Sequence, residues 1–266
     1  MAEVGAVIFG GILARCRSGV TREYPILHFV IALLSGLGTG MLSAGCRSLP
    51  SDTSEAITFH FDFDEGPLGF VAGFADYPPA HEEIYELTSG HRALPPPLGS
   101  QSGLFISGVN RSDDLFMFFK GPIADLTPGA SYGVEVSVEI ATSTPSGCFG
   151  VGGAPGESVW IKAGVTAEEP LAVMDDSYLR MNIDIGSQSN SGTQAVVLGN
   201  VANSRSCEQS PEWELKALER QSTPAGISVP ADGRVWLLIG ADSGFESRTD
   251  VYFTRASVTL TPSPGA

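Results

Sequence analysis

Residues 132–141 read Tyr-Gly-Val-Glu-Val-Ser-Val-Glu-Ile-Ala, with a large apolar side chain at every second position up to Ile140. Successive side chains of a β-strand point to opposite faces of a sheet, so this spacing creates one apolar and one polar face. The stretch is therefore predicted to be a strand with one buried face.

Similar runs recur along the chain, and most are separated by clusters of Gly, Pro, Asn, Asp or Ser. They begin with the alternating phenylalanines of 57–63 and continue at 103–107, 115–119, 159–163, 179–185, 194–201, 235–239 and 251–260. Only 213–220 has the composition of a helix, and its alternation suits a strand equally well. With no βαβ spacing and no fixed repeat, the pattern predicts an all-β fold, a two-sheet antiparallel β-sandwich formed by one domain over 57–262.

Composition and charge narrow the class of protein. Hydrophobic residues make up 42% of the chain, enough for a sizeable core, while 32 Gly and 18 Pro indicate many turns. Without its first 45 residues the chain has 12 basic and 28 acidic residues, a formal charge of 12 − 28 = −16. A field of that sign repels phosphate backbones, so we expect no nucleic-acid partner.

The first 45 residues have the features of an export signal. An uncharged apolar block at 26–34 follows Arg22, which is the order of a secretory signal. The Gly-rich stretch 35–40 is too weakly apolar for a comfortable membrane span, which needs about 20 mostly apolar residues. Residues 1–45 are therefore predicted to be a cleaved signal peptide.

The end of this leader resembles the lipobox of bacterial lipoproteins, in Leu42-Ser43-Ala44-Gly45-Cys46. The resemblance implies cleavage before Cys46, a lipid on that cysteine, and a polar tether at 46–56. Ser43 departs from the aliphatic residue usual at its position. Ordinary cleavage near Ala44 and release of a soluble protein is the alternative. In both cases the protein is exported, either to the cell envelope with a membrane anchor or as a periplasmic or extracellular protein.

Two cysteines remain for the folded domain, since Cys16 lies in the leader and Cys46 is the expected lipid site. Cys148 and Cys207 form an even pair in an exported chain, and both have flanks typical of loops. Oxidising surroundings favour a disulfide between such a pair. Two buried free thiols are the alternative.

Three motifs together resemble the galactose-binding-like jelly rolls found in many carbohydrate-binding modules. They are the acidic first strand 61–70 (FDFDEGPLGF), the turn into a long strand at 126–132 (LTPGASY) and the closing strand 251–258 (VYFTRASV). The resemblance implies a jelly-roll sandwich and a glycan as a possible partner. It covers most of 57–262, and its motifs are short, so they support the fold more than the function.

A calcium site is the only cofactor that the sequence suggests. Asp62, Asp64 and Glu65 are close together and carry the oxygen ligands that Ca²⁺ takes. The favoured interpretation is a polar outer strand face that ends in an acidic turn, so no cofactor is predicted. Arg255 stands where the resembling modules often carry acidic ligands, and a guanidinium opposes a cation there. A second acidic loop, 242–250, suits either Ca²⁺ or a salt bridge through Arg248.

Candidate ligand-binding residues lie beside loops. Tyr77 and Trp160 could stack on a sugar ring or pack in the core, and polar neighbours would fix its hydroxyls. Asp113 could instead cap a turn, because adjacent strand residues such as Asp113 and Asp114 face opposite ways and make a poor catalytic pair. The glycine-dense segment 147–157 is expected to be a surface loop next to Trp160. The predicted set is Asp76, Tyr77, Asp113, Trp160 and Lys162.

No catalytic residues are predicted. The sequence has no HExxH, CxxC or phosphate-loop motif. The favoured hypothesis is an exported envelope protein whose sandwich binds a glycan without catalysis. The alternatives are a polysaccharide hydrolase or lyase on the same scaffold, and a structural lipoprotein without a ligand. An enzyme should show a cleft with two carboxylates, and a binding protein should show exposed aromatic side chains on a loop rim.

Overall fold

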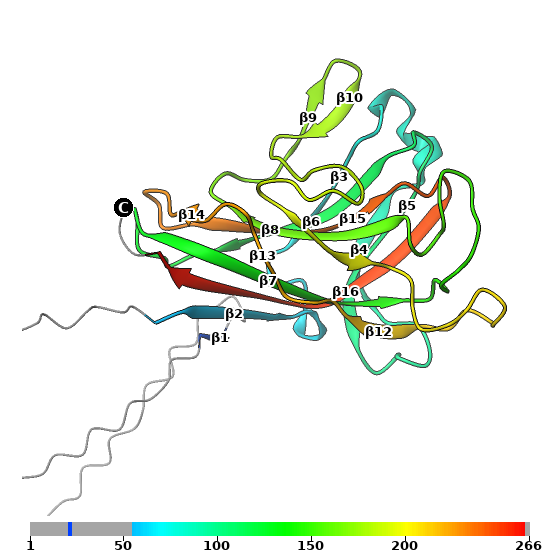
Figure 1. Ribbon diagram of the computed structural model, residues 1–266, viewed down its shortest axis with the longest axis horizontal. Coiled ribbons are helices and arrows are strands. Elements are labelled where there is room, and N and C mark those ends of the chain that lie inside the picture. Colours follow the sequence, from blue (N-terminus) through cyan, green and yellow to red (C-terminus); the bar gives the residue numbers. More distant parts are fainter. Residues whose placement is uncertain (1–20, 23–54, 264–266) are drawn as a thin grey trace, which may run out of the picture.

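The computed structural model describes residues 55–263, together with the backbone of the two-residue strand β1 (Thr21–Arg22). The described residues form two main antiparallel sheets that pack face to face (Figure 1). The predicted all-β, two-sheet antiparallel β-sandwich is thus confirmed. The rest of the predicted leader, Cys46 and the tether up to residue 54 lie outside the described residues.

The larger sheet, sheet A, is organised around the long strand β16 (Arg248–Pro262). One edge of β16 pairs with β7 (Ser131–Thr142), and the other pairs first with β5 (Ser102–Val109) and then with β2 (Ile57–Asp62). The remaining strands of sheet A are short and flank this centre: β1 beside β2, β4 (Thr88–Ala93) beside β5, and β12 (Glu214–Ala217), β13 (Gln221–Ser222) and β14 (Ile227–Ser228) beside β7. The ambiguous segment 213–220 is therefore largely an edge strand.

Sheet B has five strands in a regular antiparallel order. They are β11 (Val196–Asn200), β8 (Val159–Thr166), β15 (Val235–Ser243), β6 (Leu115–Ile123) and β3 (Val71–Ala75). Short 3₁₀ turns, η1 (Phe63–Glu65) and η2 (Pro79–Tyr85), follow β2 and β3. No helix within residues 55–263 is long and apolar enough to cross a membrane.

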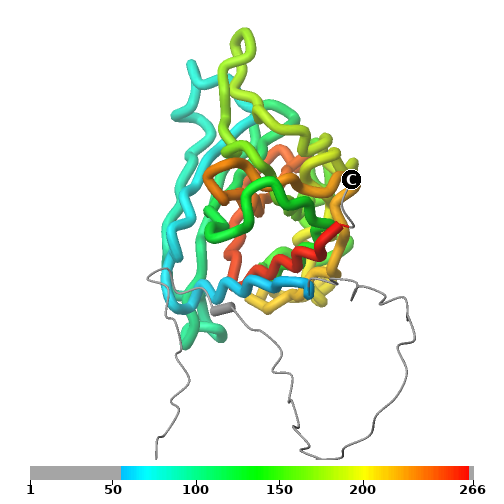
Figure 2. The backbone as a smooth tube through the Cα atoms, turned by 90° about the vertical axis from the view of Figure 1, so that its left-hand side faces the viewer, coloured from blue at the N-terminus to red at the C-terminus, as the bar shows by residue number. Residues whose placement is uncertain are grey.

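The main core lies between the inner faces of the two sheets. The alternation in 132–140 has the predicted effect, because Val134, Val136, Val138 and Ile140 are buried while the glutamates between them are half-exposed. Sheet B contributes the matching set of inward side chains, such as Leu237, Ile239 and Ala241. Seen from the end that carries the C-terminus, the strands surround the core on both sides (Figure 2).

The outer face of sheet B is covered by a further layer. The hairpin of β9 (Ala172–Asp175) and β10 (Tyr178–Met181) projects from the sandwich at the top of Figure 1. After β10, Ile183 and Ile185 pack on outward-facing Phe116, Phe118 and Leu238 in a second apolar cluster. The strand expected over 179–185 is therefore wrong beyond Met181.

The end of β15 lies beside the starts of β6 and β8 at one end of the sandwich. Ser243, at the end of β15, pairs with Leu115 at the start of β6 and with Val159 at the start of β8. The chain enters β2 at the opposite end, where Ile57 pairs with Leu260. We call the end that carries Ser243 the loop end.

The predicted disulfide between Cys148 and Cys207 is confirmed, with an S–S distance of 2.04 Å. It joins the loop after β7 to the loop after β11 (at the right of Figure 1). A backbone bridge between Ser146 and Ser206 reinforces the same junction. Two long loops at the loop end are therefore held together covalently.

Candidate ligand-binding pocket

A buried ion pair stands on the outer face of sheet B. Inward-facing Ala241 and Ile161 leave the adjacent Asp242 and Lys162 facing outward, because side chains alternate along each strand. Lys162 Nζ lies 2.7 Å from Asp242 Oδ2, and it also donates to the backbone carbonyls of Ile185 (2.9 Å) and Asn190 (3.2 Å). All three ammonium protons are thereby used, and the segment after β10 is tied to the sheet.

Asp114 lies against Asp242 at the start of β6. Burial, followed by the charge of Asp242, raises the pKa of the Asp114 carboxyl to about 8. Within residues 55–263, Oδ1 of Asp114 and Oδ1 of Asp242 are both buried and have no hydrogen-bond partner. A proton on Asp114 supplies the missing donor for such a carboxylate pair, so near neutral pH the pair holds one proton.

A third carboxylate, Asp76, follows β3 at the same end of the sheet. Its Oδ1 lies 2.8 Å from Nη1 of Arg180 on β10, and its backbone N–H donates to Leu179. Burial raises the pKa of Asp76, and the hydrogen bond from Arg180 opposes that effect. Arg180 thus neutralises Asp76 from the solvent side.

The segment after β10 closes over these groups and brings a fourth carboxylate. Asp184 accepts bonds from Gly186 N (3.0 Å) and from Thr193 N and Oγ1 (2.9 Å each), and the bonds from Thr193 and Gly186 lower its pKa. Gln188 donates its backbone N–H to Asp242 Oδ2 (2.9 Å) and its side-chain amide to the carbonyl of Asp113 (3.1 Å). These bonds fix the position of the segment.

Backbone conformation around the cluster is unusual. Asp76, Asp113 and Gln188 have φ values of 66°, 67° and 45°, in the left-handed region that residues other than glycine rarely adopt. Such conformations cost free energy and concentrate at functional sites. Three segments with such conformations meet here, which makes this end of the sandwich a candidate ligand site.

These elements enclose an open pocket of about 290 Å³. Its polar side is formed by Asp76, Asp114, Asp184 and Arg180, and its apolar side by Met181, Ile183 and Ile185. The pocket therefore combines hydrogen-bonding groups with aliphatic side chains. We call it the acidic pocket.

The predicted ligand-binding residues take different positions around it. Asp76 lines the acidic pocket, whereas Lys162 lies beneath it with no N–H left for a ligand. Asp113 is exposed at its rim, and half-buried Trp160 is the cross-strand neighbour of Asp242. Tyr77 is buried, packs on Tyr85 and donates its hydroxyl to Glu82, so its ring offers no stacking surface.

Asp114, Arg180 and Asp184 were not among the predicted site residues. The sequence suggests only Asp113 as a partner for Asp114, and these neighbours make a poor pair because they face opposite ways. The actual partner of Asp114 is Asp242, which comes from a different strand. A buried lysine between apolar neighbours signals that some buried acid must face it. The sequence offers that signal at Lys162 without identifying the acid.

Trp236 lies on the outer face of sheet B, although both of its neighbours on β15 are apolar. Val235 and Leu237 face inward, and the alternation of the strand turns Trp236 outward, where Lys120 Nζ lies 5.9 Å from its ring centre.

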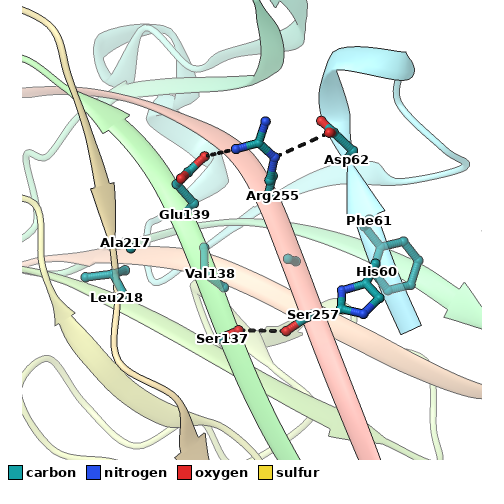
Figure 3. A pocket seen from close by; sticks show the side chains of 11 residues that line it. His60, Phe61, Asp62, Ser137, Val138, Glu139, Ala217, Leu218, Arg255 and Ser257 are labelled. Carbon is teal, nitrogen blue, oxygen red and sulfur yellow. Dashed lines mark hydrogen bonds and ion pairs between the residues drawn. The ribbon is translucent and has the colours of Figure 1, made fainter. Parts of the chain in front are cut away.

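A second hollow, of about 320 Å³, lies on the outer face of sheet A (Figure 3). Arg255 stands between two carboxylates there, 3.3 Å from Asp62 and 3.0 Å from Glu139, while the hydroxyls of Ser137 and Ser257 bond each other at 2.7 Å. We call it the sheet A groove. The carboxylates, guanidinium and hydroxyls of this groove are partnered with one another, unlike the carboxylate oxygens beside the acidic pocket.

The suggested calcium ligands are not assembled into a cation site. Asp62 pairs with Arg255, and Asp64 accepts the backbone N–H of Ser102 at 2.6 Å. In the second acidic loop, Asp242 pairs with Lys162, and Arg248 pairs with Glu86. No group of three or more His, Cys, Asp or Glu side chains in residues 55–263 is placed to hold a metal ion.

An exposed aromatic ring stands on the rim of the loop end. Phe149 follows the disulfide-bonded Cys148 and is fully exposed, at 102%. Its loop packs on the turn after β15, because Glu246 N donates to Val151 O, and that turn contacts Gln188 through Gly244. The rim is therefore connected through packed segments to the acidic pocket.

No protein-family model matches the chain, and no curated protein does. Among solved structures, a carbohydrate-binding module studied for specific mannan recognition is 10% identical over 78% of this chain and 99% of its own, with a TM-score of 0.36. A module of Caldicellulosiruptor saccharolyticus in complex with mannohexaose is 8% identical over 75% of this chain and 95% of its own (TM-score 0.33). Another structure, of promiscuous carbohydrate-binding modules from the β-sandwich superfamily, is 10% identical over 79% of this chain and 73% of its own (TM-score 0.35).

Proposed function

We propose that this chain is an exported, lipid-anchored protein of the cell envelope that binds a glycan in the acidic pocket. The observation that carries the proposal is the composition of that pocket. Carboxylates and a guanidinium bind sugar hydroxyls, and the half-buried Met181 adds an aliphatic surface that suits the C–H face of a sugar ring. A volume of about 290 Å³ fits a short glycan segment.

The placement of the pocket agrees with a protein anchored through its N-terminus. The chain enters β2 at the end of the sandwich opposite the loop end. A lipid on Cys46 would therefore leave the acidic pocket and Phe149 on the side away from the anchoring segment. An exposed aromatic ring on this rim is the feature expected of a glycan-binding protein.

Glycan binding is tested with the full chain, purified in detergent from the membranes of an expressing bacterium and applied to a glycan array. Arg180→Ala and Asp184→Ala remove polar groups from the acidic pocket, and both side chains are solvent-accessible enough to spare the fold. We expect both variants to lose binding, while Arg255→Ala in the sheet A groove keeps it. Loss only in Arg255→Ala would move the site to sheet A, and no binding to any glycan would leave the structural-lipoprotein alternative.

The lipid anchor is tested separately. Incorporation of radiolabelled palmitate should be seen in the wild type and lost in Cys46→Ala. Unchanged incorporation in the variant would contradict the proposed lipid site. Export rests on the uncharged apolar block at 26–34 and is checked by the appearance of the disulfide, which needs an oxidising compartment.

One observation favours hydrolysis as a second candidate function. A carboxyl group that stays protonated at neutral pH, as the raised pKa of Asp114 implies, is the feature that a general acid requires. The ionised Asp184 lines the same pocket. Release of reducing ends from any glycan that binds, abolished in Asp114→Asn, would support an enzyme, and binding without release would favour the non-catalytic function.

A further inference from the structure

We propose that the acidic pocket selects glycans that carry a free amino group, and that the ammonium binds among the carboxylates that line the pocket. This inference rests on the proposed glycan-binding function and specifies its ligand. It would make the protein a receptor for deacetylated amino sugars rather than for neutral ones.

The charge balance of the pocket lining is the first argument. Three carboxylates, of Asp76, Asp114 and Asp184, line the pocket together with a single guanidinium, that of Arg180. Arg180 is committed to Asp76 at 2.8 Å. The nearby ammonium of Lys162 is held beneath the pocket by Asp242 and two carbonyls. Asp114 and Asp184 thus face the pocket without a bonded cationic side chain among the residues that line it.

The unpartnered oxygens are the second, independent argument. Asp242 is 1% exposed, and its Oδ1 has no donor in the described part of the chain, nor has Oδ1 of Asp114 beside it. Charged groups face Asp114 from several elements: Asp242 on β15, Lys162 on β8, Arg180 on β10, and Asp76 after β3. With Asp114 itself, three carboxyl groups and two basic side chains meet here, and the two Oδ1 atoms have no donor among the described residues. An ammonium group supplies both positive charge and hydrogen-bond donors.

Binding of an ammonium should therefore displace the proton that the Asp114–Asp242 pair holds. Because the pKa of Asp114 is about 8, the carboxyl is mostly protonated at pH 5.5. A cation in the pocket stabilises the ionised form, so binding of a fully protonated amine releases up to one proton and strengthens as the pH rises from 4.5 to 5.5. A neutral sugar has no such effect on the ionised form.

The test compares two probes of equal length, an oligomer of β-1,4-linked glucosamine and its fully N-acetylated counterpart. Calorimetry is run on the full chain at pH 5.5, where the sugar amines are protonated, in two buffers with different ionisation enthalpies, which measures the protons released. We expect the free-amine oligomer to bind about tenfold more tightly, with a proton release that is absent for the acetylated oligomer. Asp114→Asn should abolish the proton release, and Asp184→Asn should reduce the preference for the amine.

Glu139→Gln is the matched control, because it removes one negative charge from the sheet A groove rather than from the acidic pocket. It should change neither the preference nor the proton release. Equal affinity for the two oligomers, or an equal loss of preference in Glu139→Gln and Asp184→Asn, would overturn this inference and leave glycan binding intact. Glycan binding that is absent across the array would instead defeat the proposed function itself.

Discussion

Lys162 and Asp242 form an ion pair with an N–O distance of 2.7 Å in which neither side chain is more than 2% exposed. The two residues lie on neighbouring strands of sheet B, and the lysine also holds the carbonyls of Ile185 and Asn190. The pair therefore joins the sandwich to the segment that closes the acidic pocket. Stability and the shape of the pocket depend on the same contact.

Replacing Lys162 with Met should destabilise the protein by about 3–5 kcal/mol, because a buried carboxylate then loses its counter-charge. The free energy of unfolding is measured by urea titration. Arg255→Met serves as the control, since its ion pairs are solvent-exposed and worth about 1 kcal/mol or less each. Similar losses in the two variants would mean that Asp242 is solvated or neutral in the folded protein.

The free energy of unfolding should fall as the pH rises, because Asp114 loses its proton. The folded-state pKa, about 8, lies above the ordinary value of 3.8, so the folded protein binds this proton more tightly than the unfolded chain does. The stabilisation is complete below about pH 4 and is lost as the pH rises to 8, with a slope of at most about 1.4 kcal/mol per pH unit. Urea titrations at pH 5, 6.5 and 8 measure it.

Asp114→Asn should remove this contribution, because an amide does not titrate and can donate to Asp242 permanently. The difference in stability between variant and wild type should therefore grow in favour of the variant as the pH rises. Asp184→Asn is the control, since the pKa of Asp184 is lowered and the group stays ionised throughout this range. A pH-independent difference for Asp114→Asn would show that Asp114 is ionised at pH 5.

The disulfide should contribute about 4 kcal/mol to stability, because it closes a loop with a sequence separation of 59 between Cys148 and Cys207. Urea unfolding of the Cys148→Ser/Cys207→Ser double variant, compared with the wild type under non-reducing conditions, gives the value. With reductant present, the wild type should approach the variant. A loss below about 1 kcal/mol would indicate that the reduced loops stay associated in the unfolded chain.

Gly186→Ala should impair ligand binding through the backbone. Gly186 has φ +68°, and an added Cβ would lie 2.2 Å from the carbonyl oxygen of Asn190, so the segment that lines the pocket must shift. Gly129→Ala is matched in conformation, with φ +76°, yet its Cβ would meet nothing within 4 Å. Both variants should lose about 1 kcal/mol of stability from the strained φ, but only Gly186→Ala should bind the glucosamine oligomer more weakly in calorimetry.

The sequence by itself determined the strands and the direction of their side chains. Alternation in 132–140 and in 57–61 fixed which residues enter the core, because the two-residue period of a strand is a local property. The pairing of Cys148 with Cys207 also followed from the sequence, since the predicted export left two cysteines in the domain.

Only the tertiary structure decided the acidic pocket. Asp76, Asp114, Asp184 and Asp242 come from four separate segments, and they meet because β15 lies between β6 and β8 and because the chain after β10 folds back over that sheet. Strand order depends on contacts between residues far apart in the sequence, which a period of two does not encode. The raised pKa of Asp114 has the same origin, since it requires both burial by one segment and the carboxylate of another.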